Sequence, residues 1–181
     1  MTAIKVLASA ALLLTLAACE SPTAQPTTGS ANPGDVNFVT NAYQIIRFDQ
    51  QEGAQANTEA RDPRVKALAQ RLVDEANQFE ATLGPVAKSV GVTPPNVLRD
   101  DLRVRLGHMR LQHGLDFDRT YLDDQIASHE EALRNQETMV NGKETSPAIK
   151  DLAQRGEILL RTNLQALRAI RQDMGGSTSS S

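Results

Sequence analysis

The chain has 181 residues, enough for one folded domain once non-globular ends are set aside. It has no Trp, aromatic residues make up only 3%, and the formal net charge is −3. A mildly acidic chain with interspersed charges lacks a basic face, which excludes DNA and RNA as expected partners. The single cysteine, Cys19, excludes an internal disulfide and any metal site built from several thiolates.

Residues 1–18 have the pattern of a secretory signal peptide. Lys5 supplies a basic start, and the apolar stretch at 6–16 is too short for a comfortable membrane span. The following run, Leu16-Ala17-Ala18-Cys19, resembles the lipobox of bacterial lipoproteins, whose cysteine is acylated and becomes the mature N-terminus. The resemblance implies a lipid, such as palmitate, on Cys19. The alternative is an ordinary secretory signal that happens to contain a cysteine.

The residue after the cysteine bears on the membrane. In bacterial lipoproteins an aspartate there tends to keep the protein at the inner membrane, whereas this chain has Glu20. The resemblance therefore implies anchoring on the periplasmic side of the outer membrane, with the inner membrane as the alternative. Several acyl chains would hold the protein on a membrane without spanning it, because each buried CH₂ contributes about 0.8 kcal/mol.

The segments that flank the folded part are polar and rich in small residues. Pro, Thr, Ser and Gly dominate 20–34, so residues 19–36 are expected to form a lipidated, disordered tether. The end of the chain, 173–181, contains GGSTSSS and is expected to be a disordered tail. The folded domain is therefore expected at 37–172.

The first two of four long stretches have apolar residues at helical spacing. The first stretch begins near Asp35 or Asn37, and its apolar stripe turns polar at Asp49. The second opens with Asp62-Pro63, an N-cap followed by proline at the first helical position, and stops at Gly91. Both are predicted to be amphipathic helices.

A connector and two further helices complete the predicted fold. Residues 97–112 predict a short helix, and 115–141 predict a long one with His129 in the middle of its buried face. Gly142 ends that helix, and Ser146-Pro147 repeats the cap-then-proline start. The pattern predicts an all-α, four-helix bundle with a short extra helix in the crossover between the second and third long helices.

A family resemblance rests mainly on one segment of the third long helix. Gly114-x-x-Phe117-Asp118-Arg119-x-Tyr121, followed by His129, resembles the signature of a bacterial ferritin-like group called domain of unknown function 4142. Two more segments, Asp62-Pro63-x-Val65-Lys66 and 88–95, resemble the start and the end of that family's second helix. The resemblance covers about 37–170 and implies a ferritin-like bundle.

The resemblance also implies inward-facing residues of metal-ligand type. At the corresponding positions this chain has Asp49, Glu75-Ala76, His129 and Asn163, so two of the family's three histidines are replaced. Three or four oxygens and one imidazole would suit one hard or borderline divalent ion. The alternative is that His129 is a core histidine hydrogen-bonded to Asp49 or Asn163. Tyr121 is expected to pack with its hydroxyl bonded near a helix end.

The sequence contains no recognisable catalytic signature. It has no GxSxG, no P-loop and no Glu-x-x-His pair of the kind that di-iron bundles use. We therefore expect a non-enzymatic lipoprotein of the bacterial envelope that acts as an interaction or stress-related module, associating with itself or with another envelope protein. The alternative is a divalent metal-binding or redox-protective bundle. An enzyme with an unrecognised substrate is the third possibility.

Overall fold

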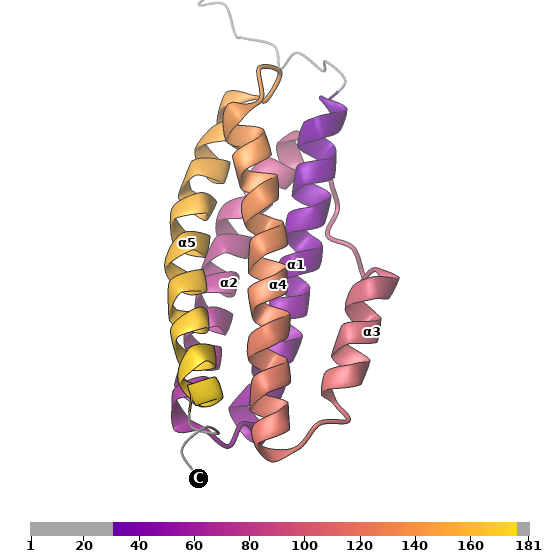
Figure 1. Cartoon of the computed structure of the whole chain (residues 1–181). Coiled ribbons are helices and arrows are strands. Elements are labelled where there is room, and N and C mark those ends of the chain that lie inside the picture. Colours follow the sequence, from indigo (N-terminus) through magenta and orange to yellow (C-terminus); the bar gives the residue numbers. More distant parts are fainter. Residues whose placement is uncertain (1–30, 177–181) are drawn as a thin grey trace, which may run out of the picture.

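The computed structural model describes residues 31–176 of the chain. Within that range the fold is entirely helical (Figure 1), as predicted, with five helices and no strand: α1 Pro33–Glu59, α2 Pro63–Ser89, α3 Asp100–Met109, α4 Gly114–Asn141 and α5 Pro147–Gly176. The expected signal peptide, Cys19 and most of the expected tether lie outside the described residues.

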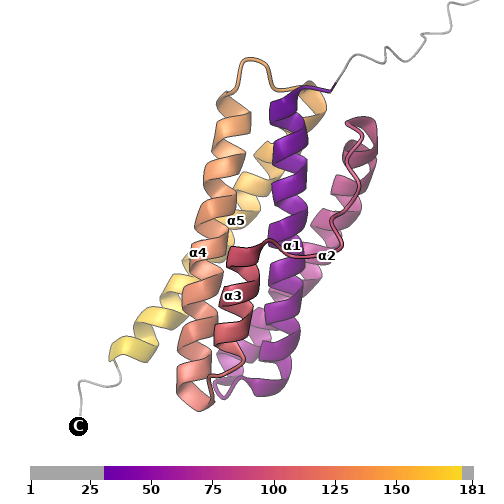
Figure 2. The same ribbon diagram turned by 90° about the vertical axis from the view of Figure 1, so that its right-hand side faces the viewer.

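Four long helices run side by side, and the short α3 lies against the seam between α1 and α4 (Figure 2). Short connections join α1 to α2 and α4 to α5, so each of these pairs is antiparallel. The connection from α2 to α4 instead runs down the side of the bundle and includes α3, so α2 and α4 point the same way. The predicted crossover is therefore confirmed.

Polar caps and prolines explain where two of the long helices begin. Oδ1 of Asn32 accepts a 2.8 Å hydrogen bond from the backbone N–H of Gly34 at the start of α1. Oδ1 of Asp62 accepts one of the same length from Arg64 at the start of α2. Each cap satisfies an N–H that has no partner inside the helix, and the proline that follows has no N–H to satisfy.

The start of α1 differs from the expected boundary at residue 37. Residues 33–36, assigned to the tether from their composition, belong to the helix because Asn32 caps it and Pro33 occupies its first turn. The buried Asp35 also ties this turn to the start of α5, since its Oδ2 accepts a 3.3 Å hydrogen bond from the backbone of Ser146.

The end of α5 also extends beyond its expected boundary. The helix continues to Gly176, past the expected limit at 172, and Met174 is only 5% exposed. Burial of an apolar side chain contributes about 1.5–3 kcal/mol, which favours continuing the helix over this last turn. The remaining residues of the expected tail, 177–181, lie outside the described range.

The apolar core has two parts. One lies toward the α1–α2 connection and includes the fully buried Phe48, Phe117 and Leu102. The other lies toward the α4–α5 connection and includes Leu83 and Ile149. Buried polar residues of α1 and α4 lie at the level where these two clusters meet, and there the candidate site is found.

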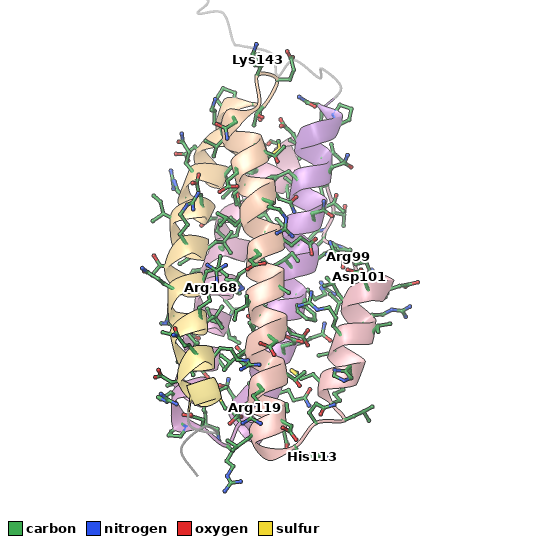
Figure 3. All side chains as sticks on the ribbon, viewed as in Figure 1. Arg99, Asp101, His113, Arg119, Lys143 and Arg168 are labelled. Carbon is green, nitrogen blue, oxygen red and sulfur yellow. The ribbon has the colours of Figure 1, made fainter. Side chains whose placement is uncertain are left out.

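Charged side chains cover the outside of the bundle (Figure 3). Several pair across helices: Arg168 of α5 meets Glu130 of α4 at 2.7 Å, and Arg171 of α5 meets Asp123 of α4 at 2.7 Å, whereas Arg99 and Asp101 form a local pair at the start of α3. Exposed pairs of this kind contribute roughly 0–1 kcal/mol each, so packing decides the fold. No helix among residues 31–176 is both long and apolar enough to cross a membrane.

Candidate functional site

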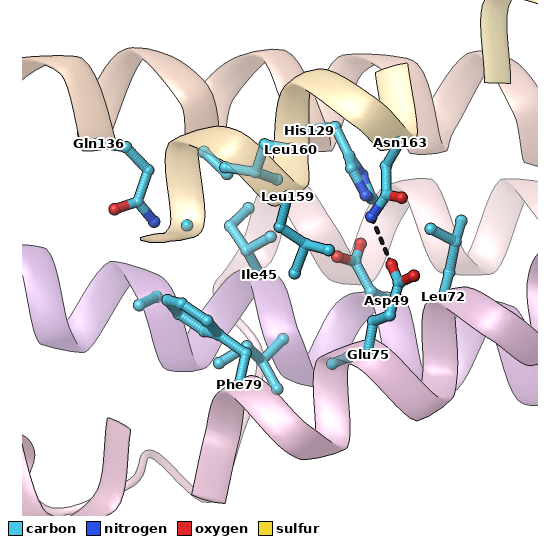
Figure 4. Close-up of a pocket in the computed structure, with 15 residues that line it drawn as sticks. Ile45, Asp49, Leu72, Glu75, Phe79, His129, Gln136, Leu159, Leu160 and Asn163 are labelled. Atoms are coloured by element: carbon cyan, nitrogen blue, oxygen red, sulfur yellow. Dashed lines mark hydrogen bonds between the residues drawn. The ribbon is translucent and has the colours of Figure 1, made fainter. Parts of the chain in front are cut away.

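A cavity of about 60 Å³ lies inside the bundle, and α1, α2, α4 and α5 all contribute to its lining (Figure 4). Its walls are mostly apolar and include Ile45, Phe79 and Leu159. The polar lining consists of Asp49, Glu75, His129, Gln136 and Asn163. The four residues predicted as candidate ligands therefore share one cavity, although they come from four different helices.

Asp49 supplies the carboxylate from α1. Ser128 donates a hydrogen bond to its Oδ1 at 3.1 Å, and the Nε2 amide of Gln125 donates another to the same oxygen at 3.2 Å. Burial raises the pKa of Asp49, while the nearby His129 and the two hydrogen bonds lower it and so oppose the effect of burial. Since both bonds end on Oδ1, they do not use Oδ2.

Glu75 and Asn163 belong to a closed network between α2 and α5. The Nδ2 amide of Asn163 donates to Oε2 of Glu75 at 2.7 Å, while one guanidinium nitrogen of Arg71 donates to Oε1 of Glu75 at 2.7 Å and to Oδ1 of Asn163 at 2.8 Å. All the carboxylate and amide oxygens of the pair are thus engaged. Arg71 also balances the charge of Glu75.

His129 of α4 is only 3% exposed, and its ring lies beside Asn163 (Figure 4). Its Nδ1 lies 3.5 Å from Oγ of Ser128, a long contact for a hydrogen bond. Among residues 31–176 the ring forms no hydrogen bond with Asp49 or Asn163, the two partners expected for a core histidine, because those side chains bond to Ser128, Gln125, Glu75 and Arg71. Ser128, the preceding residue on the same helix, is its polar neighbour.

A second group of buried polar residues adjoins Asp49, and the sequence did not predict it as part of the site. Glu52 is 0% exposed, and the same Nε2 of Gln125 that reaches Asp49 donates to its Oε2 at 3.0 Å. Burial, followed by the nearby Asp124 carboxylate, raises the pKa of Glu52 well above its usual value. One amide thus bridges two buried carboxyl groups.

Tyr121 lies in the same layer, and its surroundings differ from the prediction. Its hydroxyl is buried and has no hydrogen-bond partner among residues 31–176, rather than being bonded near a helix end. Burial raises the pKa of Tyr121 well above its usual value, and the nearby carboxyl groups of Asp49 and Glu52 raise it further. The spacing of Tyr121, Gln125 and Ser128 along α4 could have indicated this face, because the intervals are four and three residues.

The donor set does not fit the metal site that the family resemblance implies. In the part of the chain that the structure describes, no three His, Cys, Asp or Glu side chains form a group that could hold a metal ion. The oxygens of Glu75 and Asn163 are engaged with each other and with Arg71. Of the four predicted ligands, Asp49 and His129 alone keep atoms for an ion, fewer than the three or four protein ligands of ordinary zinc sites.

A groove adjoins the cavity between α2 and α5. It has a volume of about 190 Å³ and shares Glu75, Phe79 and Leu159 with the cavity lining. Its far part includes Thr82 of α2 and Arg155 of α5. A ligand in the cavity could therefore extend into this groove past Phe79 and Leu159.

These features define an all-α, ferritin-like bundle with a crossover helix and a polar-lined internal cavity. The family model described as "Domain of unknown function (DUF4142)" matches residues 20–170, so the chain belongs to this family, as the helix signature predicted. No curated protein matches the chain.

A solved structure has a similar fold. The chain is similar to the "Crystal structure of DUF305 fragment from Deinococcus radiodurans", with a TM-score of 0.71 over 80% of this chain and 99% of that one. The two sequences are 14% identical, so the likeness concerns the fold alone.

Proposed function

We propose that this protein is a non-enzymatic binding module of the bacterial envelope, held at the outer membrane by lipid on Cys19, with the central cavity as its ligand site. The observation that carries the binding half is the cavity itself, which has apolar walls and a polar end built from all four long helices. Most ligand sites are concave, apolar and fixed by a few placed polar groups.

The hydrogen bonds around the cavity support binding rather than catalysis. Arg71 and Asn163 hold Glu75, while Ser128 and Gln125 hold Asp49. Such partners fix side chains in one orientation, which favours recognition of a shape and a charge. The hydroxyl of Ser128 lies 3.5 Å from Nδ1 of His129 but donates its hydrogen bond to Asp49 at 3.1 Å, so it is not paired with His129 in the way that covalent catalysis requires.

A ligand screen on residues 19–181, the chain without the expected signal peptide, tests whether the cavity binds a ligand. Thermal unfolding is measured with small cations, amines, carboxylates and alcohols, because a ligand that binds only the folded state raises the melting temperature. Backbone NMR shifts should then change at Ile45, Ala132 and Leu159, which line the cavity. If no ligand shifts the melting temperature or these signals, the cavity is only a packing defect and this half of the proposal fails.

The membrane half rests on the Leu16-Ala17-Ala18-Cys19 run. Cells producing the natural chain, Cys19→Ala or the matched control Ser21→Ala are separated into soluble, inner-membrane and outer-membrane fractions. We expect the natural chain and the control in the outer membrane, and Cys19→Ala in the soluble fraction. A Cys19→Ala protein that stays fully in the membrane would exclude lipid anchoring through this residue. Cross-linking in the same cells tests association with itself or with another envelope protein.

A divalent ion in the same cavity is the competing proposal. The observation in its favour is that Asp49 and His129, one oxygen and one nitrogen donor, both line the cavity. Water would have to complete the coordination shell. Elemental analysis after incubation with Mn, Fe and Zn is compared between the natural chain, His129→Ala and the control His113→Ala, whose side chain is exposed. One ion per chain, lost only in His129→Ala, would support a metal or redox-protective role.

A further inference from the structure

The charges around the cavity indicate which ligand it favours. Glu75 has a cationic partner in Arg71, which donates to it at 2.7 Å. Asp49 is also buried, yet it forms no ion pair with any residue of the described range, and its hydrogen bonds come from the neutral Ser128 and Gln125. Arg105 acts on Asp49 electrostatically but forms its ion pair with Asp124. A buried carboxylate without an ion pair of its own is costly, so this end of the cavity favours a positively charged ligand.

The rest of the lining favours an organic cation over a metal ion. A metal ion needs several inner-sphere donors, and residues 31–176 contain no such set. An ammonium group needs only hydrogen-bond acceptors, and its carbon chain gains from apolar walls. Ile45, Phe79 and Leu159 provide those walls, and an aromatic ring such as that of Phe79 also attracts cations.

The volumes of the cavity and of the adjoining groove indicate where the head and the carbon chain of such a ligand would lie. The cavity, at about 60 Å³, is smaller than the roughly 150 Å³ engineered cavity that accommodates benzene, so it takes a head group and little more. The adjoining groove, at about 190 Å³, has room for a chain that passes between Phe79 and Leu159.

We propose that the cavity and the α2–α5 groove together bind an aliphatic primary ammonium, with its head at Asp49 and His129 and its chain between Phe79 and Leu159. This inference rests on the proposed binding function, because it names the ligand class of the same cavity. The far part of the groove includes Thr82 and Arg155, and Arg155 already pairs with Asp151 at 2.6 Å, so the groove lining formed by the described residues has no unpaired carboxylate there for a second ammonium. The site therefore prefers a monoamine to a diamine of equal length.

Calorimetry on the mature chain, residues 19–181 with Cys19→Ala, tests this preference. The probes are hexylamine, hexane-1,6-diamine, hexanoate and the chlorides of Mn and Zn. We expect one hexylamine per chain, bound at least about tenfold more tightly than the diamine or hexanoate, because only the monoamine matches the charges at both ends. Equal binding of hexylamine and hexanoate would overturn the inference, since the charge at Asp49 would then not matter.

Two variants locate the binding. Asp49→Asn keeps the shape of the side chain and removes its charge, so we expect about a tenfold loss of hexylamine affinity. The control Asp74→Asn changes an exposed carboxylate on α2 and should leave the affinity unchanged. Ala132→Leu fills the cavity from α4 and should abolish binding while helicity by circular dichroism stays the same. If Asp49→Asn and Ala132→Leu both bind as tightly as the natural chain, hexylamine lies elsewhere and the inference falls.

The outcomes of these experiments distinguish a wrong ligand assignment from a failure of the proposed binding function. If Mn, Zn or hexanoate binds and Ala132→Leu abolishes that binding, the cavity is a ligand site and only the ammonium assignment is wrong. If no probe here and no compound of the wider screen binds, the proposed binding function fails as well.

Discussion

The side-chain amide of Asn163 on α5 donates a 2.7 Å hydrogen bond to Oε2 of Glu75 on α2. Arg71, one helical turn before Glu75, binds both partners and closes the network. The network joins two helices beside the cavity and lies at the edge of the groove, which Glu75 also lines. It therefore ties the stability of the bundle to the wall of the proposed binding site.

Asn163→Ala should destabilise the fold because it removes the donor to Glu75 and an acceptor of Arg71. Loss of a partner in this partly buried network costs about 1–3 kcal/mol in the free energy of unfolding. Urea unfolding followed by circular dichroism measures the change. Gln165→Ala, exposed on the same helix, serves as the control and should lie within about 0.5 kcal/mol of the natural chain. Equal midpoints for the two variants would show that the network contributes little.

Asp118 should be among the most sensitive polar positions of the chain. It is 0% exposed, and its two carboxylate oxygens accept hydrogen bonds from the backbone N–H groups of Arg61 and Asp62 at 2.9 and 2.7 Å. It thereby fixes the connection between α1 and α2 from the neighbouring α4. Asp118→Ala leaves both donors without a partner, so we expect a loss of about 2–4 kcal/mol.

The matched control for this variant is Asp116→Ala, two residues earlier on the same helix. Asp116 is exposed and forms a 3.3 Å ion pair with Arg119, which contributes less than about 1 kcal/mol. Thermal and urea unfolding should show a clearly larger loss of stability for Asp118→Ala than for Asp116→Ala. A similar loss for the two would mean that the contact of Asp118 with the α1–α2 connection is not a source of stability.

The helices were predictable because their boundaries carry local signals. Asp62 and Ser146, each followed by proline, immediately precede α2 and α5 as expected, and Gly91 follows α2 with φ of +73°, in the left-handed range that favours glycine. The start of α1 at Pro33 lies shortly before the expected Asp35 or Asn37, because Asn32-Pro33, the same signal, lies inside a stretch rich in small polar residues. The composition of this stretch predicts a disordered tether, whereas Asn32-Pro33 predicts a helix start. The helix begins at Pro33, as the cap indicates.

The candidate site was predictable only in part. Helical periodicity placed Asp49, His129 and Asn163 on inward faces, the family resemblance added Glu75, and all four line one cavity. Their hydrogen-bond partners could not be inferred in the same way, because a long side chain such as that of Arg71 reaches the core from a partly exposed position. Side-chain reach depends on rotamers and packing, which periodicity does not contain.

Glu52 should make the stability of the protein depend on pH. Its pKa is raised well above the ordinary 4.5 by burial and by the Asp124 and Asp49 carboxylates, so the folded chain holds this proton to a higher pH than the unfolded chain does. By proton linkage, its favourable contribution is complete below pH 4.5 and is lost as the pH rises toward the raised value. The raised pKa of Asp49 acts in the same direction.

Glu52→Gln tests this linkage because it keeps the shape and removes the titration. Relative to the natural chain, the variant should gain stability as the pH rises from 4.5 to about 8, by about 1–3 kcal/mol at the upper end, since a buried charge is no longer formed. Melting temperatures across this range measure the difference. Glu59→Gln, exposed at the end of α1, is the control and should follow the natural chain. A constant difference between Glu52→Gln and the natural chain at every pH would contradict the prediction.

Two glycines in helices should respond to alanine with opposite signs. At Gly53 of α1, an added Cβ would lie 2.3 Å from Cγ2 of Val73 on α2 and 3.4 Å from the backbone oxygen of Ala69. Val is branched at Cβ and cannot easily turn away, so the two helices must separate. Overpacking costs about 1–3 kcal/mol and outweighs the gain of up to about 1 kcal/mol in helix propensity. Gly53→Ala should therefore lower the free energy of unfolding.

Gly107 of α3 has no atom within 4 Å of an added Cβ. Gly107→Ala should therefore show the propensity gain alone, about 1 kcal/mol of added stability, because alanine loses less backbone entropy in a helix. Urea unfolding of Gly53→Ala and Gly107→Ala measures whether each substitution lowers or raises the free energy of unfolding. If Gly53→Ala also stabilises the protein, α1 and α2 can separate at this point without loss. The bundle beside the cavity would then be more adaptable than the close contact of Gly53 with Val73 implies.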